Sequence, residues 1–175
     1  MRTWAAATAA AFLFLVPAFA VPFDSSDLGF SAEYPSTPTV GAPEGSEQDS
    51  AGNFVSHSVT VSSISQGEYA AMVAVDTYDS PIKLDIDGSL INERDNFLKG
   101  LKASYTSSTK GTQNGYQALF FTYDTPDHSA AGSGFIAIDV AARPRIYVVV
   151  TMRTPSASSA EISALDSFLG GFHIK

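Results

Sequence analysis

The densest group of chemically useful side chains lies in the segment Asp124-Thr125-Pro126-Asp127-His128. Two carboxylates and an imidazole this close together can bind a divalent metal ion with open coordination positions, or can form an acid–base pair. Asp124, Asp127 and His128 are therefore the candidate metal ligands of this chain. The same residues also suit a solvated turn after a strand, because aspartate often bonds the backbone of turns. No further ligand can be named from the sequence, so both interpretations stay open.

A second histidine raises the question of hydrolysis. His57 lies on the apolar face of an alternating segment, residues 54–64, where it can act as a general base toward one of many serines. The segment Ala131-Gly132-Ser133-Gly134-Phe135 has a glycine on each side of its serine but lacks the Gly-x-Ser-x-Gly spacing of a nucleophile elbow. A partly buried histidine bonded to the backbone explains the position of His57 as well. A small hydrolase built on His57 or on Asp124 and His128 is kept as an alternative.

Arginines at positions 143, 145 and 153 surround one predicted hairpin. Arg143 and Arg145 are the candidate residues for binding an anion or carboxylate, because guanidinium groups bind such ligands through paired hydrogen bonds. The other interpretation is that these charges protect an apolar strand at a sheet edge from aggregation. We favour the edge interpretation.

The segment from Lys83 to Gly88 invites comparison with a calcium-binding loop. With Gly88 at the sixth position of such a loop, Lys83 and Arg94 would occupy the first and twelfth positions, where oxygen ligands are required. A turn followed by a helix cap is the simpler explanation. If calcium did bind, its ligands would be Asp85, Asp87 and Glu93. No phosphate-binding glycine loop is present either, and we expect no cofactor.

Composition excludes several classes of function. The chain has 175 residues, 45% of them hydrophobic, which is enough for one domain with its own core. It contains no cysteine, so disulfides and zinc–thiolate sites are excluded. Its formal net charge is −8, without a cluster of basic residues, which argues against binding nucleic acids or anionic lipids.

The first twenty residues, MRTWAAATAAAFLFLVPAFA, are typical of a cleavable export signal. Arg2 provides the positive charge, an apolar run follows, and Pro17 precedes small residues at Ala18 and Ala20. The run is shorter than a membrane span requires. We expect cleavage after Ala20 and a mature protein in the periplasm or outside the cell, with no membrane span after the signal is removed.

Beyond the signal, we expect a flexible lead-in over residues 21–29 and one domain over residues 30–175. Alternating or β-branched segments predict strands, and a loop is expected over residues 35–52 because of its prolines and glycines. Apolar spacing predicts a helix from Leu90 to Tyr105, capped by Asp87 or Ser89. Ser158 and Glu161 form the capping box of a second helix that ends at Gly170 and Gly171. The predicted strands are residues 30–34, 54–64, 68–78, 116–123, 134–140 and 146–153, with a further edge strand expected near 106–110.

The order β-β-β-α-β-β-β-α predicts an α+β fold, an antiparallel sheet of about six strands flanked by helices. The segments FSAEYP, EYAAMVAVDTY, FLKGLKASY, YQALFFTYDTP, GFIAIDVAARPRIYVVVTM and EISALDSFLGGFHI resemble the PsbP-like superfamily of small exported proteins. The resemblance covers nearly the whole predicted mature chain. It implies an α/β/α sandwich and an accessory or binding role without catalysis.

The sequence therefore predicts an exported, non-catalytic accessory or binding domain with an unknown ligand and a possible protein partner in the exported compartment. The alternatives are a small hydrolase and a metal-dependent structural protein of the periplasm.

Overall fold

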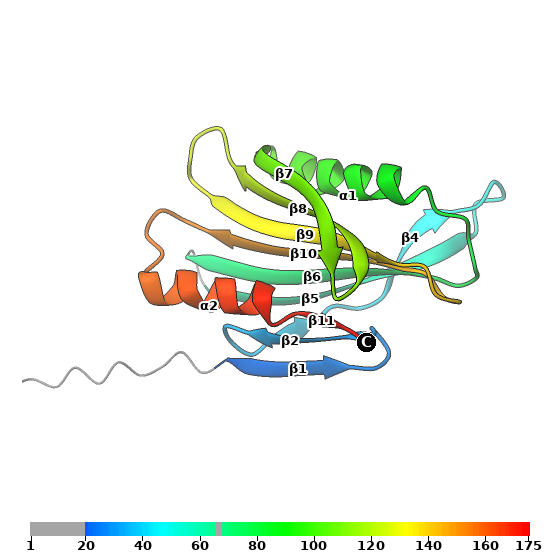
Figure 1. The fold of residues 1–175 in the computed structure, drawn as a ribbon, viewed down its shortest axis with the longest axis horizontal. Coiled ribbons are helices and arrows are strands. Elements are labelled where there is room, and N and C mark those ends of the chain that lie inside the picture. The colour runs from blue at the N-terminus through cyan, green and yellow to red at the C-terminus, as the bar shows by residue number, and fades with distance from the viewer. Residues whose placement is uncertain (1–19, 66–67) are drawn as a thin grey trace, which may run out of the picture.

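The computed structural model describes residues 20–65 and 68–175, and these form eleven strands and two helices (Figure 1). The predicted export signal, apart from Ala20, lies outside the described residues. The elements are β1 (Val21–Ser25), β2 (Phe30–Tyr34), β3 (Thr39–Val40), β4 (Glu44–Gln48), β5 (Phe54–Ser65), β6 (Tyr69–Tyr78), α1 (Ile86–Leu101), β7 (Ser104–Gln113), β8 (Tyr116–Asp124), β9 (Ala131–Asp139), β10 (Arg145–Arg153), α2 (Ser159–Gly170) and β11 (His173–Ile174).

An antiparallel sheet of eight strands forms the centre of the molecule, with the order β3-β5-β6-β10-β9-β8-β7 and with β4 paired to β5. The predicted α+β class is confirmed, but the predicted number of six strands is too low. The predicted strand over residues 30–34 lies in a second sheet, and the edge strand expected near residues 106–110 is β7. The two additional strands beside β5 come from residues 35–52, which we expected to be a loop. β3 and β4 are exposed along their length, so no apolar alternation marks them in the sequence.

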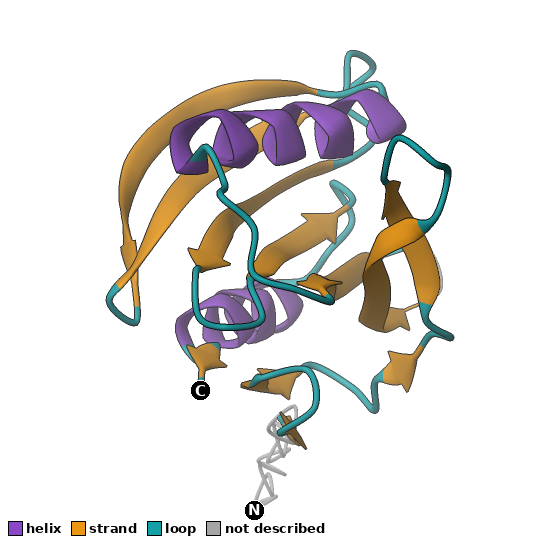
Figure 2. Cartoon of the chain, turned by 90° about the vertical axis from the view of Figure 1, so that its right-hand side faces the viewer, coloured by secondary structure: helices purple, strands orange, loops and turns teal. Residues whose placement is uncertain are grey.

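The central sheet is covered on both faces (Figures 1 and 2). Helix α1 packs on one face, and α2 together with a small second sheet packs on the other. The long strands contribute alternate residues to each of the two cores, as a two-sided sheet requires. The largest side chains of the α2 core are Phe30, Tyr34, Phe135, Tyr147, Phe168 and Phe172, and those of the α1 core are Tyr78, Leu90, Leu98, Leu119, Phe121 and Tyr123.

The second sheet has the order β1-β2-β11 and joins the two ends of the described chain. Residues 21–25, which we expected to be part of a flexible lead-in, instead pair with β2 from Val21↔Tyr34 to Ser25↔Phe30. β2 has the bounds, residues 30–34, that its alternating pattern predicts. The side chains of Phe30 and Phe172 stack with ring centroids 5.3 Å apart, which attaches this sheet to the core.

Both helices have defined caps, and one differs from the prediction. Ser158 and Glu161 form the predicted capping box of α2. Helix α1 is capped by Asp85, whose side chain accepts a hydrogen bond from the Gly88 backbone. It ends at Leu101, before the predicted Tyr105, because Lys102 adopts a left-handed conformation with φ of 54° and the chain then enters β7.

Strand β9 begins at Ala131, three residues earlier than predicted, so Gly132 also lies in the strand. A Cβ atom at Gly132 would overlap the Thr151 carbonyl oxygen and the Tyr123 hydroxyl group. That hydroxyl group donates a 2.9 Å hydrogen bond to the same carbonyl. Gly132 thus allows a buried tyrosine to cross over the strand, a recognised use of glycine in sheets.

Candidate functional site

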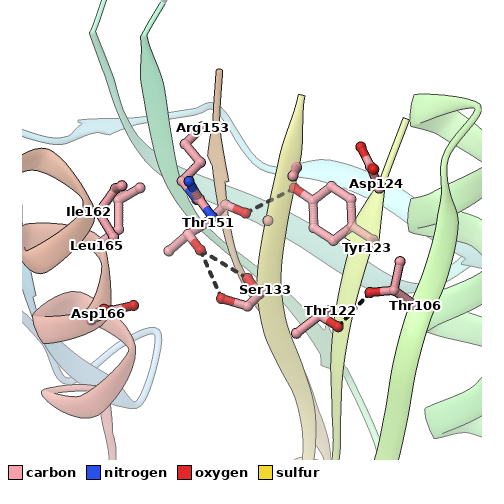
Figure 3. A pocket seen from close by; sticks show the side chains of 12 residues that line it. Thr106, Thr122, Tyr123, Asp124, Ser133, Thr151, Arg153, Ile162, Leu165 and Asp166 are labelled. Carbon is pink, nitrogen blue, oxygen red and sulfur yellow. Dashed lines mark hydrogen bonds between the residues drawn. The ribbon is translucent and has the colours of Figure 1, made fainter. Parts of the chain in front are cut away.

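A cavity of about 430 Å³ opens between α2 and the ends of strands β8, β9 and β10 (Figure 3). Its volume is in the range of small-molecule sites in proteins. The helix provides one wall, with Ile162, Leu165 and Asp166, and the strands provide the opposite wall and the floor. The cavity exists because α2 packs over β2, β6 and β10 and leaves the α2-facing side of β7, β8 and β9 without a helix.

Hydroxyl groups line the floor of this cavity. The buried Thr151 hydroxyl donates a 3.1 Å hydrogen bond to the Ser133 carbonyl oxygen and lies 3.4 Å from the Ser133 hydroxyl oxygen. On the next strands, the Thr122 hydroxyl oxygen lies 2.7 Å from that of Thr106. These groups come from four different strands and form a polar floor that can exchange hydrogen bonds with a ligand.

Charged side chains of both signs stand at the rim. Arg153 ends β10, and Figure 3 shows its guanidinium group turned toward the hydroxyl groups of Ser133 and Thr151. Asp166 projects from α2 toward the strands, and Asp124 ends β8 on the far wall. Among residues 20–65 and 68–175, neither Arg153 nor Asp166 has an oppositely charged partner within 4.0 Å.

A second cavity of about 380 Å³ continues from the first, because Thr122 and Ser133 line both. Its walls are mainly apolar and come from Phe120, Phe135 and Leu169. The two cavities form one groove along α2, polar at the end near Arg153 and apolar toward Phe120. We call this the α2 groove.

The structure brings together two of the three candidate metal ligands. The His128 Nδ1 atom contacts a carboxylate oxygen of Asp124 at the rim of the α2 groove. Asp127 turns away and accepts hydrogen bonds from the backbone and the hydroxyl group of Ser129, which lower its pKa to about 2. This is the turn role that aspartate plays after strands. Within the described part of the chain, no group of three His, Asp or Glu side chains is arranged to hold a metal ion.

The two histidines considered for hydrolysis lie at opposite ends of the central sheet. His57 is exposed, not partly buried, and its Nδ1 atom lies 3.3 Å from an Asp79 carboxylate oxygen beyond the end of β6. His128 lies at the end near Arg153. In the described ranges no hydroxyl group bonds to either imidazole, which is the contact that activates a serine nucleophile.

The arginines do not form one cluster. Arg145 and Arg153 stand at opposite ends of β10, and β10 lies between β6 and β9 in the middle of the sheet, so our edge interpretation is wrong. Arg145 donates a 3.2 Å hydrogen bond to the Asp27 carbonyl oxygen and so links β10 to the turn of the second sheet. Arg143 lies 3.6 Å from Asp79 on the exposed surface.

The residues compared with a calcium loop serve separate purposes. Asp85 caps α1, and Asp87 forms an ion pair of 2.8 Å with Lys110 on β7. Glu93 faces the sheet, where burial, together with the nearby charges of Asp76 and Glu47, raises its pKa to about 6. These three side chains therefore do not converge on one site.

Glu93 on α1 lies near Asp76 on β6 and Glu47 on β4, and the three carboxylates form an acidic cluster. Burial raises the pKa of Asp76, and one of its carboxylate oxygens is buried without a hydrogen-bond partner among the described residues. Next to it, the Tyr78 hydroxyl group donates a 2.7 Å hydrogen bond to Glu47. Burial and this bond raise the pKa of Tyr78. The Tyr78–Glu47 bond links β4 to β6, in addition to the pairing of β4 with β5. The sequence gives no sign of the cluster because its members are far apart in the chain.

The α2 groove was not predicted from the sequence. Ser133 entered only as part of an incomplete catalytic motif, and Thr151 lies within a segment interpreted as an apolar strand. Their proximity depends on the pairing of Thr151 with Ser133 between β10 and β9, which no local pattern determines. The sequence did contain one signal of the groove: Thr151 lies on the same face of β10 as Val149 and Tyr147, where an apolar residue would be expected.

Comparison with known proteins identifies a similar fold. No protein-family model and no curated protein sequence matches the chain. The solution structure of cyanobacterial PsbP (CyanoP) from Synechocystis sp. PCC 6803 superimposes with a TM-score of 0.56 at 10% identity, covering 90% of this chain and 94% of that one. The fold is PsbP-like. The resemblance inferred from sequence segments is therefore confirmed at the level of the fold, and identity this low supports no more than the fold.

Proposed function

We propose that the chain works after export as a non-catalytic accessory or binding domain, and that the α2 groove is its binding surface. The observation that carries this proposal is the groove itself, a cavity of about 430 Å³ with a hydroxyl floor and charged rim that continues into an apolar cavity. Binding sites typically combine apolar walls with a few placed polar groups in this way. The PsbP-like fold supports an accessory role.

Export to the periplasm or the medium is part of the proposal. It is supported by the signal-like pattern of residues 1–20 and by the start of β1 at Val21, directly after the predicted cleavage site. Within the described residues, no helix has the length and apolarity needed to cross a membrane.

The test compares the parent chain with Thr122→Arg, which places a long side chain across the groove floor from an exposed position. The matched control is Thr112→Arg, an exposed position on the α1-facing side of β7. Each protein is produced from the full gene and recovered from the exported fraction of its host. It is then used in two assays: capture of protein partners from that fraction, and a melting curve in the presence of the small molecules extracted from it. We expect a captured partner or a rise in Tm with the parent and the control, and neither with Thr122→Arg. Equal capture and equal melting for all three would contradict the groove as the binding surface.

The size of the expected shift follows from mass action. A ligand that binds only the folded chain stabilises it by about 2.7 kcal/mol at a hundredfold excess over its Kd. Such a shift is readily measured by calorimetry.

A further inference from the structure

We infer that the polar end of the α2 groove binds the zwitterionic head of a free α-amino acid, and that the apolar part of the groove holds a large apolar side chain. This inference rests on the proposed binding role and adds the class of ligand. It is argued from the charges, the hydroxyl groups and the shape of the groove.

The charges at the rim are the first argument. Arg153 and Asp166 line the same cavity from opposite walls, and neither is neutralised by another side chain in the described part of the chain. A guanidinium group binds a carboxylate through two parallel hydrogen bonds, and a carboxylate accepts hydrogen bonds from an ammonium group. An α-amino acid provides both groups on one carbon atom.

Ligands with a single charge fit less well. A simple carboxylate or phosphate would meet Arg153 but would also face Asp166 on the helix wall of the same cavity. A simple amine would face the guanidinium group of Arg153. Like charges close together in a partly enclosed site are unfavourable, so the mixture of signs selects a ligand that carries both.

The floor provides hydrogen bonds for the charged head. Figure 3 shows Thr151 and Ser133 below Arg153, between the helix wall and the strand wall. The Ser133 hydroxyl group has only a long contact of 3.4 Å to the hydroxyl group of Thr151 in the described chain, so it can also bond to a ligand. Hydroxyl groups both donate and accept, and they suit either charged group of an amino acid.

The apolar walls determine the side chain. Ile162 and Leu165 border the polar cavity on the α2 side, and Phe120, Phe135 and Leu169 line the continuing cavity of about 380 Å³. Burial of a leucine or phenylalanine side chain from water favours binding, by about tenfold in affinity or more. Amino acids with small or polar side chains would leave this part of the groove empty.

The experiment is isothermal titration calorimetry of the exported chain with L-leucine and L-phenylalanine. Two analogues of leucine each lack one charge: L-leucinamide lacks the carboxylate, and N-acetyl-L-leucine lacks the ammonium group. L-Serine lacks the apolar side chain. We expect saturable binding of L-leucine or L-phenylalanine with a Kd of about 1 mM or lower, and at least about tenfold weaker binding of the amide, the acetylated compound and serine.

Two variants assign the contacts. Arg153→Gln should weaken binding of the better of the two amino acids about tenfold or more. It should not weaken binding of L-leucinamide, which has no carboxylate for Arg153 to bind and no longer faces a like charge. Asp166→Asn should weaken binding of the same amino acid. It should not weaken binding of N-acetyl-L-leucine, which has no ammonium group for Asp166 to bind and no longer faces a like charge. Both positions are exposed, and a melting curve for each variant verifies that it folds. Matched controls on exposed sites away from the groove are Arg143→Gln and Asp27→Asn, which should bind as the parent does.

The inference is overturned if the folded parent binds neither amino acid saturably, if both charged analogues bind as well as leucine, or if Arg153→Gln and Asp166→Asn bind like the parent. Its failure differs from failure of the proposed function. If Thr122→Arg abolishes capture or the extract-induced rise in Tm while the amino acids do not bind, the groove remains the binding surface and the ligand class is wrong.

Discussion

At the scale of single residues, the acidic cluster beneath α1 destabilises the folded chain electrostatically when its carboxylates are charged. Glu93, Asp76 and Glu47 come from three elements and lie close enough to raise the pKa of Glu93 to about 6, with burial as the larger cause. In the described chain, the ion pairs of the nearby arginine, Arg94, go to Asp95 and not to this cluster. Carboxylates without a cation are less stable when charged, so this cluster favours protonated states.

The stability of the fold should therefore depend on pH in a definite direction. Because the pKa of Glu93 rises from 4.5 in the unfolded chain to about 6 in the folded chain, its contribution is most favourable below pH 4.5 and is lost as the pH rises through 6. We expect Glu93→Gln to raise the free energy of unfolding at pH 7 by about 1 kcal/mol, after allowance for solvent screening of a partly exposed group. Urea unfolding of the parent and the variant between pH 5 and pH 7.5 measures this difference. Glu44→Gln, an exposed change on β4, is the control, and the same pH dependence for Glu93→Gln and the parent would contradict the role of Glu93.

At the scale of elements, glycine has opposite roles in a strand and in a helix of this protein. In β9, Gly132 provides the space in which Tyr123 crosses to the Thr151 carbonyl oxygen. In α1, Gly100 has no neighbouring atom within 4 Å of an added Cβ atom. The first glycine is required by packing, whereas the second only reduces the helix propensity of its segment.

The same substitution should therefore change stability in opposite directions at the two sites. We expect Gly132→Ala to lower the free energy of unfolding by about 2 kcal/mol or more, because the added atom overlaps the Thr151 carbonyl oxygen and forces β9 and β10 apart. Gly100→Ala should raise it by up to about 1 kcal/mol. Thermal or urea unfolding of both variants measures these changes. If Gly132→Ala left the free energy of unfolding unchanged, β9 would be able to shift without loss of stability.

At the scale of the whole molecule, aromatic packing joins the two sheets. The ring of Phe30 lies 5.3 Å from that of Phe172 and 6.4 Å from that of Tyr147, so β2 contacts both the chain end and the central sheet. β11 pairs with β2 through His173↔Ser31 and Ile174↔Phe30. The first and last strands of the described chain therefore depend on one shared core.

Removal of the Phe30 ring should weaken the entire fold and not only the second sheet. We expect Phe30→Ala to lower the free energy of unfolding by about 3–5 kcal/mol, as is usual for fully buried phenylalanines. Phe54→Ala is the matched control, because its side chain is half exposed, and it should cost much less. Circular dichroism melts of both variants test this. A Phe30→Ala chain that retains a single transition at the parent Tm would mean that the second sheet contributes little to stability.

Features that depend on neighbours in the chain were predictable from the sequence. The strands β2, β5 and β6 and the capping box at Ser158 all appear where the sequence pattern places them. Each depends on side-chain periodicity or on a local hydrogen bond, which a short segment determines by itself.

Tertiary structure alone decided the strand order, the additional strands and the binding groove. β3 and β4 form because β5 offers an open edge, and backbone hydrogen bonds of that kind do not require an apolar side-chain pattern. Arg153, Ser133 and Asp166 share one cavity only because β9 pairs with β10 in a fixed register and α2 lies across the end of β10. The sequence determined the long strands β5, β6, β8, β9 and β10 and the two helices. Long-range pairing determined the additional strands and which polar side chains meet.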